Sequence, residues 1–153
     1  MSNNDQGIML RAYAASDEDA SIALWLRTWQ AAYPQLDFTE RLAWWHGRWR
    51  GELVPAAAIV VAEQGGVLVG FVTVDARTLY LDQMVVAPEC WRSGVGTALI
   101  DDAKRLSPRG LDLDVNADNA RAIAFYRRNG FLVSGSGVNP ISGAPVHRMR
   151  WRP

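Results

Sequence analysis

The chain has 153 residues, with 16 Lys plus Arg and 16 Asp plus Glu, so its formal net charge is zero when His is neutral. This length fits one domain that needs no disulfide or metal to hold a core. Balanced charge argues against broad capture of nucleic acid, and no apolar run approaches the roughly 20 residues of a membrane-spanning helix. The first six residues do not read as a signal peptide, and the single cysteine, Cys90, permits no internal disulfide. A cytoplasmic protein without a membrane partner is therefore the default expectation.

The N-terminal part is predicted to form a strand over 8–14 followed by two helices. Ser16 is the expected N-cap of the first helix, with acidic residues in its first turn, and Pro34 ends it. The second helix is expected to begin after Thr39. Five of the seven tryptophans lie in this part, where they either pack in the core or form an aromatic wall around a ligand: Trp25, Trp29, Trp44, Trp45 and Trp49.

The rest of the chain alternates strands and helices. Strands are expected at 57–63, 67–74, 78–86, 111–115, 131–134 and 146–151, and helices at 94–106 and from Asp118 or Asn119 to Gly130. The order β-α-α-β-β-β-α-β-α-β-β predicts an α/β (α+β) domain over residues 7–153, behind a short tail at 1–6. Its sheet is expected to be mixed, with helices on both faces.

A Gly94-Val95-Gly96 turn lies between a predicted strand and a helix. Two glycines there let backbone N–H groups converge beside the positive end of the helix, an arrangement that binds phosphate oxygens. A Walker loop needs a Lys after the last glycine, and none follows Gly96. A dinucleotide fingerprint needs a third glycine where Leu99 stands. By itself, the turn is either a phosphate cradle or an ordinary tight turn.

A second pattern, N-x-x-A-x-x-x-Y-x-x-x-G-F, follows the next strand and is matched at Asn119, Ala122, Tyr126, Gly130 and Phe131. With the glycine turn, residues 81–131 resemble the Gcn5-related N-acetyltransferase (GNAT) family, whose first motif is [QR]-x-x-G-x-[GA]. The resemblance implies a largely antiparallel sheet with a splayed strand pair. It also implies direct acetyl transfer from acetyl-coenzyme A (acetyl-CoA) to an amine. The chain departs from the first motif at Trp91, where Gln or Arg is usual.

The same resemblance implies where the cofactor lies. Its pantetheine arm is expected to pair with the strand edge at Met84, Val85 and Val86 and to contact Asn119. Its pyrophosphate is expected on the turn residues Arg92, Ser93, Gly94, Val95, Gly96 and Thr97, with Arg92 as the supporting side chain. His46 and His147 have no metal-ligand spacing with other residues, so no metal site is expected.

Two residues are the candidate catalysts. Tyr126 matches the family's tyrosine beside the coenzyme sulfur, and a phenol of pKa about 10 can return a proton to the departing thiolate. The alternative for Tyr126 is packing against the sheet. Asp82 is the candidate base, with Asp112, Asp114 or a water chain as alternatives. A backbone N–H of the splayed strand can stabilise the oxyanion.

The acceptor is less defined by the sequence. Trp29, Tyr33, Gln83 and His147 are the candidate acceptor-binding residues, and no acidic cluster points to a polyamine. We therefore expect a primary amine of a small molecule or peptide as the acceptor. The alternative is a non-catalytic acyl-CoA-binding sensor of the same fold. A homodimer is compatible with the sequence, and a nucleophilic role for Cys90 is disfavoured because no His lies near it in the sequence.

Overall fold

The structure is a computed structural model that describes residues 7–140 and 142–153. Within them, seven strands form one sheet in the order β1-β2-β3-β4-β5-β7-β6. The strands are β1 (Ile8–Ala12), β2 (Ala58–Gln64), β3 (Val67–Asp75), β4 (Tyr80–Val86), β5 (Leu111–Asn116), β6 (Leu132–Val138) and β7 (Pro145–Trp151). All neighbours are antiparallel except β4 and β5, which are parallel. The predicted mixed, largely antiparallel sheet is confirmed.

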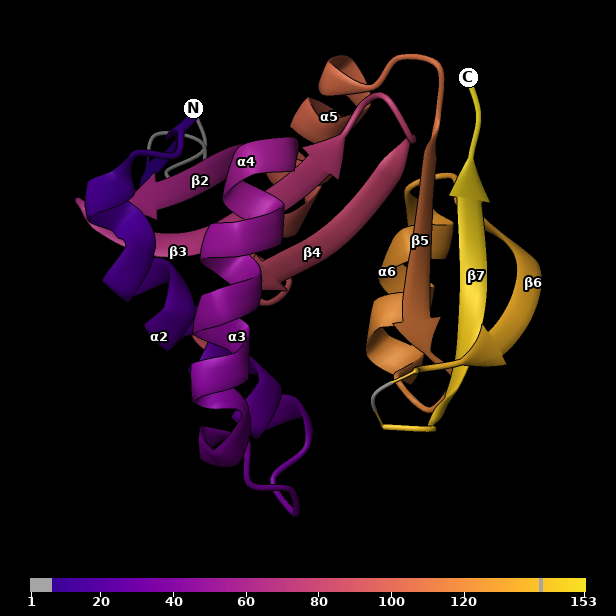
Figure 1. The fold of residues 1–153 in the computed structure, drawn as a ribbon. Coiled ribbons are helices and arrows are strands. Elements are labelled where there is room, and N and C mark those ends of the chain that lie inside the picture. The colour runs from indigo at the N-terminus through magenta and orange to yellow at the C-terminus, as the bar shows by residue number, and fades with distance from the viewer. Residues whose placement is uncertain (1–6, 141) are drawn as a thin grey trace.

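Helices cover both faces of the sheet (Figure 1). One face carries α2 (Glu18–Ala32), α3 (Leu42–Arg48) and α4 (Val54–Ala56), and the other carries α5 (Val95–Leu106) and α6 (Ala120–Arg128). We call the first of these the front face and the second the back face. No helix in the described part of the chain is long and apolar enough to cross a membrane.

The start of the first helix differs from the prediction. Ser16 is not its N-cap, because a 3₁₀ turn at Ala15–Asp17 comes first and α2 begins after Asp17. The Asp17 carboxylate accepts a hydrogen bond of 2.8 Å from the Ala14 amide and ion-pairs with Arg11 of β1. Asp17 therefore makes no side-chain hydrogen bond to the first turn of α2 but bonds back to Ala14, and its ion pair with Arg11 fastens the 3₁₀ turn to the sheet.

The second helix continues further than its sequence pattern suggested. After α3, a π-helical turn at Trp49–Leu53 leads into α4, so one irregular rod runs across the front face. Trp49 is fully buried and meets Phe71 of β3 edge-on at 5.2 Å. Trp45 stacks on Trp25 of α2 at 4.7 Å. Core packing therefore accounts for these three tryptophans, whereas Trp44 is 45% exposed.

Strands β4 and β5 separate almost as soon as they pair. Their ladder contains a single pair, Tyr80 with Asp112, whereas β4 pairs with β3 and β5 pairs with β7 along their lengths. The two parts of the sheet diverge beyond this point (Figure 1). The splayed strand pair is present, and it leaves one edge of β4 without a neighbouring strand.

Candidate active site

The free edge of β4 presents backbone groups from alternate residues. The Ala87 amide donates a 2.8 Å hydrogen bond to the Val69 carbonyl of β3. Antiparallel pairing alternates, so the amide and carbonyl of Val85 also point toward β3, while those of Met84 and Val86 point away from it. Since β5 pairs only at Tyr80, these groups face the separation between the strands. An extended chain with amide groups can pair with them.

A β-bulge lies just before this edge and directs Asp82 to the front face. Thr73 pairs with Gln83 but Val74 pairs with Leu81, so Asp82 is the extra residue. Its carboxylate accepts hydrogen bonds of 2.7 and 2.6 Å from Arg48 of α3, and Gln83 donates a third at 3.1 Å. The ion pair raises the pKa of the Arg48 guanidinium. The structure thus brings Asp82 and Gln83 together and adds Arg48, which the sequence analysis did not single out.

The glycine turn leaves a group of backbone amides unpaired. Gly94, at φ +94°, is the N-cap of α5 and supplies no side chain to it. The first helical bond runs from the Ala98 amide to the Gly94 carbonyl. Within the described residues, the amides at 94–97 have no hydrogen-bond acceptor. These are the unsatisfied donors of a helix start, and with the helix dipole they fit a pyrophosphate group.

The second glycine of the turn has a packing role. A Cβ on Gly96 would lie 3.0 Å from the ring of Phe125 in α6. Contacts this close are avoided by real side chains, so glycine lets α5 and α6 approach each other on the back face. The motif therefore combines a left-handed turn at Gly94 with a tight helix contact at Gly96.

The side chains around the turn make few contacts with it, and the expected contact of Arg92 with the pyrophosphate stays a prediction. Arg92 is exposed and has a left-handed backbone, φ +69°, and the Ser93 hydroxyl bonds back to the Cys90 carbonyl. Trp91 donates from its indole Nε1 to the Val86 carbonyl at 2.8 Å. Arg121 of α6 lies over the Trp91 ring, 3.6 Å from its centroid. Arg121 falls between motif positions, so the sequence analysis missed it.

Tyr126 lies in α6 and is 8% exposed. Its ring contacts Phe125 and Phe131 at centroid distances of 5.4 and 5.5 Å. Its hydroxyl makes no hydrogen bond with any described residue, and burial raises its pKa. The phenol is therefore held protonated, which is the state that a proton donor needs.

Asn119 is the N-cap of α6. Its side-chain oxygen accepts a 3.2 Å hydrogen bond from the Ala122 amide. Capping uses the oxygen and leaves the Nδ2 group for another partner. The motif asparagine thus fixes the start of α6 beside the separated strands.

Tyr33, at the end of α2, reaches across to the far side of the separation. Its hydroxyl donates to Asp118 at 2.8 Å and accepts from Asn116 of β5 at 3.1 Å. Trp29 stacks on its ring at 5.8 Å, and burial raises the pKa of the Tyr33 phenol. The structure thus brings Trp29 and Tyr33 together at the front face. It adds Asn116 and Asp118, which the sequence did not mark as acceptor-site residues.

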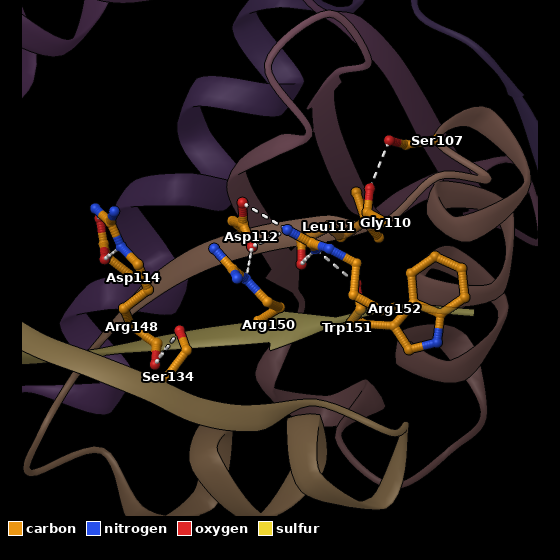
Figure 2. Close-up of polar contacts among 10 residues, drawn as sticks. All are labelled: Ser107, Gly110, Leu111, Asp112, Asp114, Ser134, Arg148, Arg150, Trp151 and Arg152. Atoms are coloured by element: carbon orange, nitrogen blue, oxygen red, sulfur yellow. Dashed lines mark hydrogen bonds and ion pairs between the residues drawn. The ribbon is translucent and has the colours of Figure 1, made fainter.

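The other candidate bases are held in ion pairs on the front of β5 and β7 (Figure 2). Asp114 pairs with Arg148 at 3.2 Å and accepts a hydrogen bond from Tyr80 at 3.0 Å. Asp112 pairs with Arg150 at 2.9 Å and with Arg152 at 3.2 Å. We call these five charged residues the C-terminal ion-pair ladder.

His147 is not brought together with Trp29 and Tyr33. It follows Val146 and precedes Arg148 on β7, so its side chain lies on the back face, in a hollow beside Ala120 and Arg127 of α6. Its Nδ1 is buried without a hydrogen-bond partner among the described residues. No three His, Cys, Asp or Glu side chains in the described part of the chain are grouped to hold a metal.

Two neighbouring strands that separate beside a helix start with unpaired backbone amides form the architecture of an acyl-CoA-binding transferase. The sequence matches the acetyltransferase (GNAT) family over residues 19–131, and the chain belongs to that family. It is an N-acetyltransferase that uses acetyl-CoA as its co-substrate. The unpaired amides of the turn and the free edge of β4 fit this molecule.

Individual relatives agree with this assignment. The chain is 29% identical to the peptidyl-lysine N-acetyltransferase YiaC of Escherichia coli, over 94% of this chain and 96% of that protein. The alignments to curated relatives cover from 42% to 96% of those proteins. The solution structure of apo YjaB from E. coli superposes with a TM-score of 0.76 at 25% identity, covering 94% of this chain and 97% of that one. PaiA N-acetyltransferase from Thermoplasma acidophilum, in complex with coenzyme A, shares the fold, with a TM-score of 0.77 at 18% identity over 95% and 99% of the two chains.

Proposed function

We propose that this enzyme acetylates the ε-amino group of a peptidyl lysine. The observation that carries acetyl transfer is the separation of β4 and β5 after one residue pair, which leaves the backbone groups of Met84 and Val86 without a partner strand. The choice of acceptor is supported by YiaC, whose name assigns it peptidyl lysine and which aligns along nearly its whole length. The exposed rim of the front face, with Arg148 55% exposed, is accessible to a peptide.

The proposed cofactor site combines the free edge of β4 with the glycine turn. The pantetheine arm pairs with Met84 and Val86, while the pyrophosphate accepts hydrogen bonds from the amides at 94–97. Asn119 is left with its Nδ2 group to contact the arm. The adjacency of this edge and this turn supports the placement, because only Ala87, the 3₁₀ turn η4 (Pro88–Cys90) and four turn residues separate β4 from α5.

In the proposed reaction, the neutral amine attacks the thioester carbonyl. An N–C bond forms, the C–S bond breaks, and a β4 amide that faces the separation stabilises the oxyanion in between. The Tyr126 hydroxyl gives its proton to the departing thiolate. The ammonium proton passes to Asp82 through water, because both oxygens of that carboxylate also hold Arg48.

The acceptor is tested with purified enzyme, acetyl-CoA and a panel of amines. The panel contains a lysine peptide, the same peptide with Arg in place of Lys, a free amino acid and an aromatic amine. We expect thiol release with the lysine peptide, and mass spectrometry should place the acetyl group on Nε. Acetylation of the small amines alone contradicts the peptidyl-lysine proposal. Binding of coenzyme A without turnover of any amine in a broad panel favours the sensor alternative.

The phosphate site is tested at Thr97, an exposed residue in the first turn of α5. Thr97→Asp places a carboxylate beside the unpaired amides, where an acid stabilises a helix but repels a pyrophosphate. We expect the affinity for coenzyme A to fall about tenfold or more while the melting temperature is kept or raised. Thr97→Asn is the neutral control. Equal affinity in the two variants places the pyrophosphate elsewhere.

A further inference from the structure

Trp91 occupies a hydrogen-bonding position on the free edge of β4. Its indole Nε1 donates to the Val86 carbonyl at 2.8 Å, and this carbonyl points into the separation between β4 and β5. A backbone carbonyl at a sheet edge is an acceptor that an extended chain uses when it pairs with the strand. The indole therefore takes an acceptor that an incoming amide needs.

Arg121 holds the indole in this position. Its guanidinium lies 3.6 Å from the centroid of the Trp91 ring, a close cation–π contact. Among the described residues, Arg121 has neither an acidic partner nor a hydrogen-bond acceptor. Its contact with Trp91 also joins the first turn of α6 to the loop that precedes α5.

The pantetheine arm of coenzyme A carries two amide groups, each with one N–H donor. If the arm pairs with the edge at Met84 and Val86, one of these donors requires the carbonyl that Trp91 now holds. Both donors must reach the Val86 carbonyl from the free side of β4, where the bulky indole already lies within hydrogen-bond distance of it.

We propose that Trp91 is an affinity-determining residue that the pantetheine arm displaces from the Val86 carbonyl when coenzyme A binds. The inference rests on the proposed placement of the arm along β4. Binding breaks the indole hydrogen bond, forms one from a pantetheine amide, and releases the indole N–H to water. Trp91 therefore lowers the affinity of the enzyme for its cofactor.

The test is isothermal titration calorimetry with Trp91→Phe. Phenylalanine keeps an aromatic ring beneath Arg121 and removes the competing N–H together with the five-membered ring of the indole. Trp44→Phe is the matched control for this loss of ring size, because Trp44 is 45% exposed on α3 and makes no hydrogen bond to β4 among the described residues. Two probes are used: coenzyme A, which has the arm, and adenosine 3′-phosphate 5′-diphosphate, which has the phosphates without the arm.

We expect Trp91→Phe to bind coenzyme A about three- to tenfold more tightly than the wild type, the gain that follows from losing one net hydrogen bond in the free enzyme. Its affinity for the armless nucleotide and both affinities of Trp44→Phe should stay unchanged. An unchanged affinity for coenzyme A in Trp91→Phe overturns the proposal. Weaker binding also overturns it, because the indole N–H would then be a cofactor contact.

A second measurement uses the wild-type enzyme. The indole N–H resonance of Trp91 is assigned by its absence from the ¹⁵N spectrum of Trp91→Phe. Its exchange with solvent should be slow in the free enzyme and fast once coenzyme A is bound. Slow exchange in both states contradicts displacement. The proposed pyrophosphate site fails on a different result, namely equal affinity of coenzyme A for the wild type and for Thr97→Asp. The failure of the Trp91 proposal and the failure of the proposed cofactor site are therefore distinguishable.

Discussion

The two parts of the sheet on either side of the β4–β5 separation are stabilised in different ways. The part containing β1 to β4 lies beneath a layer of buried aromatic side chains from α2, α3 and the π-helical turn, among which Trp45 and Trp49 are at most 1% exposed. The part containing β5, β7 and β6 presents the C-terminal ion-pair ladder on its front face (Figure 2), and every residue of β6 is exposed. On the front face, apolar side chains cover the first part and charged side chains cover the second, whereas Leu111, Leu113 and Met149 of the second part are at most 1% exposed.

This difference is functionally useful. The cofactor edge belongs to the well-buried part, so Met84 and Val86 are carried by a strand that is paired with β3 along its length. The opposite wall is tied to it by the Tyr80–Asp112 pair and by the hydrogen bonds of Tyr33. The edge that would pair with the arm is therefore held by β3 and does not depend on the opposite wall.

The largest effect is expected at Tyr126, which lies on the C-terminal side and is the proposed proton donor. Tyr126→Phe keeps the ring contacts with Phe125 and Phe131 and removes only a hydroxyl that has no hydrogen-bond partner among the described residues. We expect kcat to fall about 10²- to 10⁴-fold, the usual range for a general acid, with little change in stability or in cofactor affinity. Steady-state kinetics and thermal melting check this. An unchanged kcat with chemistry rate-limiting assigns Tyr126 to packing.

The aromatic layer is tested at Trp49. Trp49→Ala removes a fully buried ring that contacts Tyr13, Trp45 and Phe71, and it should lower the free energy of unfolding by about 3–5 kcal/mol. Trp44→Ala, on the exposed side of α3, should change it by less than about 0.5 kcal/mol. Urea denaturation measures both. Similar losses in the two variants would mean that burial does not distinguish these tryptophans.

The order of the strands and helices could be predicted from the sequence, but contacts between residues far apart in the chain could not. Signals such as Pro34 after the first helix and the Gly94 turn before α5 are local, so the order of strands and helices was predicted correctly. The π-turn after Arg48 was missed because tertiary packing of Trp49, rather than helix propensity, favours it. The Arg48–Asp82 pair joins residues 34 positions apart. The Trp91–Arg121 contact likewise depends on how α5 and α6 pack, which no local pattern reveals.

A pH prediction follows from Asp17 at the edge of the well-buried part. Hydrogen bonds from Arg11 and the Ala14 amide hold the pKa of the Asp17 carboxyl below its ordinary value of 3.8. A lowered pKa in the folded state gives stability that is present above the ordinary pKa and is lost as the pH falls through the lowered one. Asp17→Asn should lower the free energy of unfolding by about 1 kcal/mol near neutral pH, because the charged hydrogen bonds with Arg11 are lost, and it should flatten the loss of stability as the pH falls below 3.8. Denaturation curves across this range check the prediction, and parallel profiles for the two proteins contradict it.

The smallest effect is expected in the C-terminal ion-pair ladder. Arg150 is 50% exposed and pairs with Asp112, which also keeps Arg152 as a partner. Exposed pairs of this kind contribute about 0–1 kcal/mol, because water and salt screen the charges. Arg150→Gln should therefore lower the free energy of unfolding by less than about 1 kcal/mol, and the difference from wild type should shrink at 1 M salt, where the screening length is about 3 Å. A loss as large as that of Trp49→Ala, or one that persists in high salt, would show that charge holds the C-terminal part as firmly as burial holds the other.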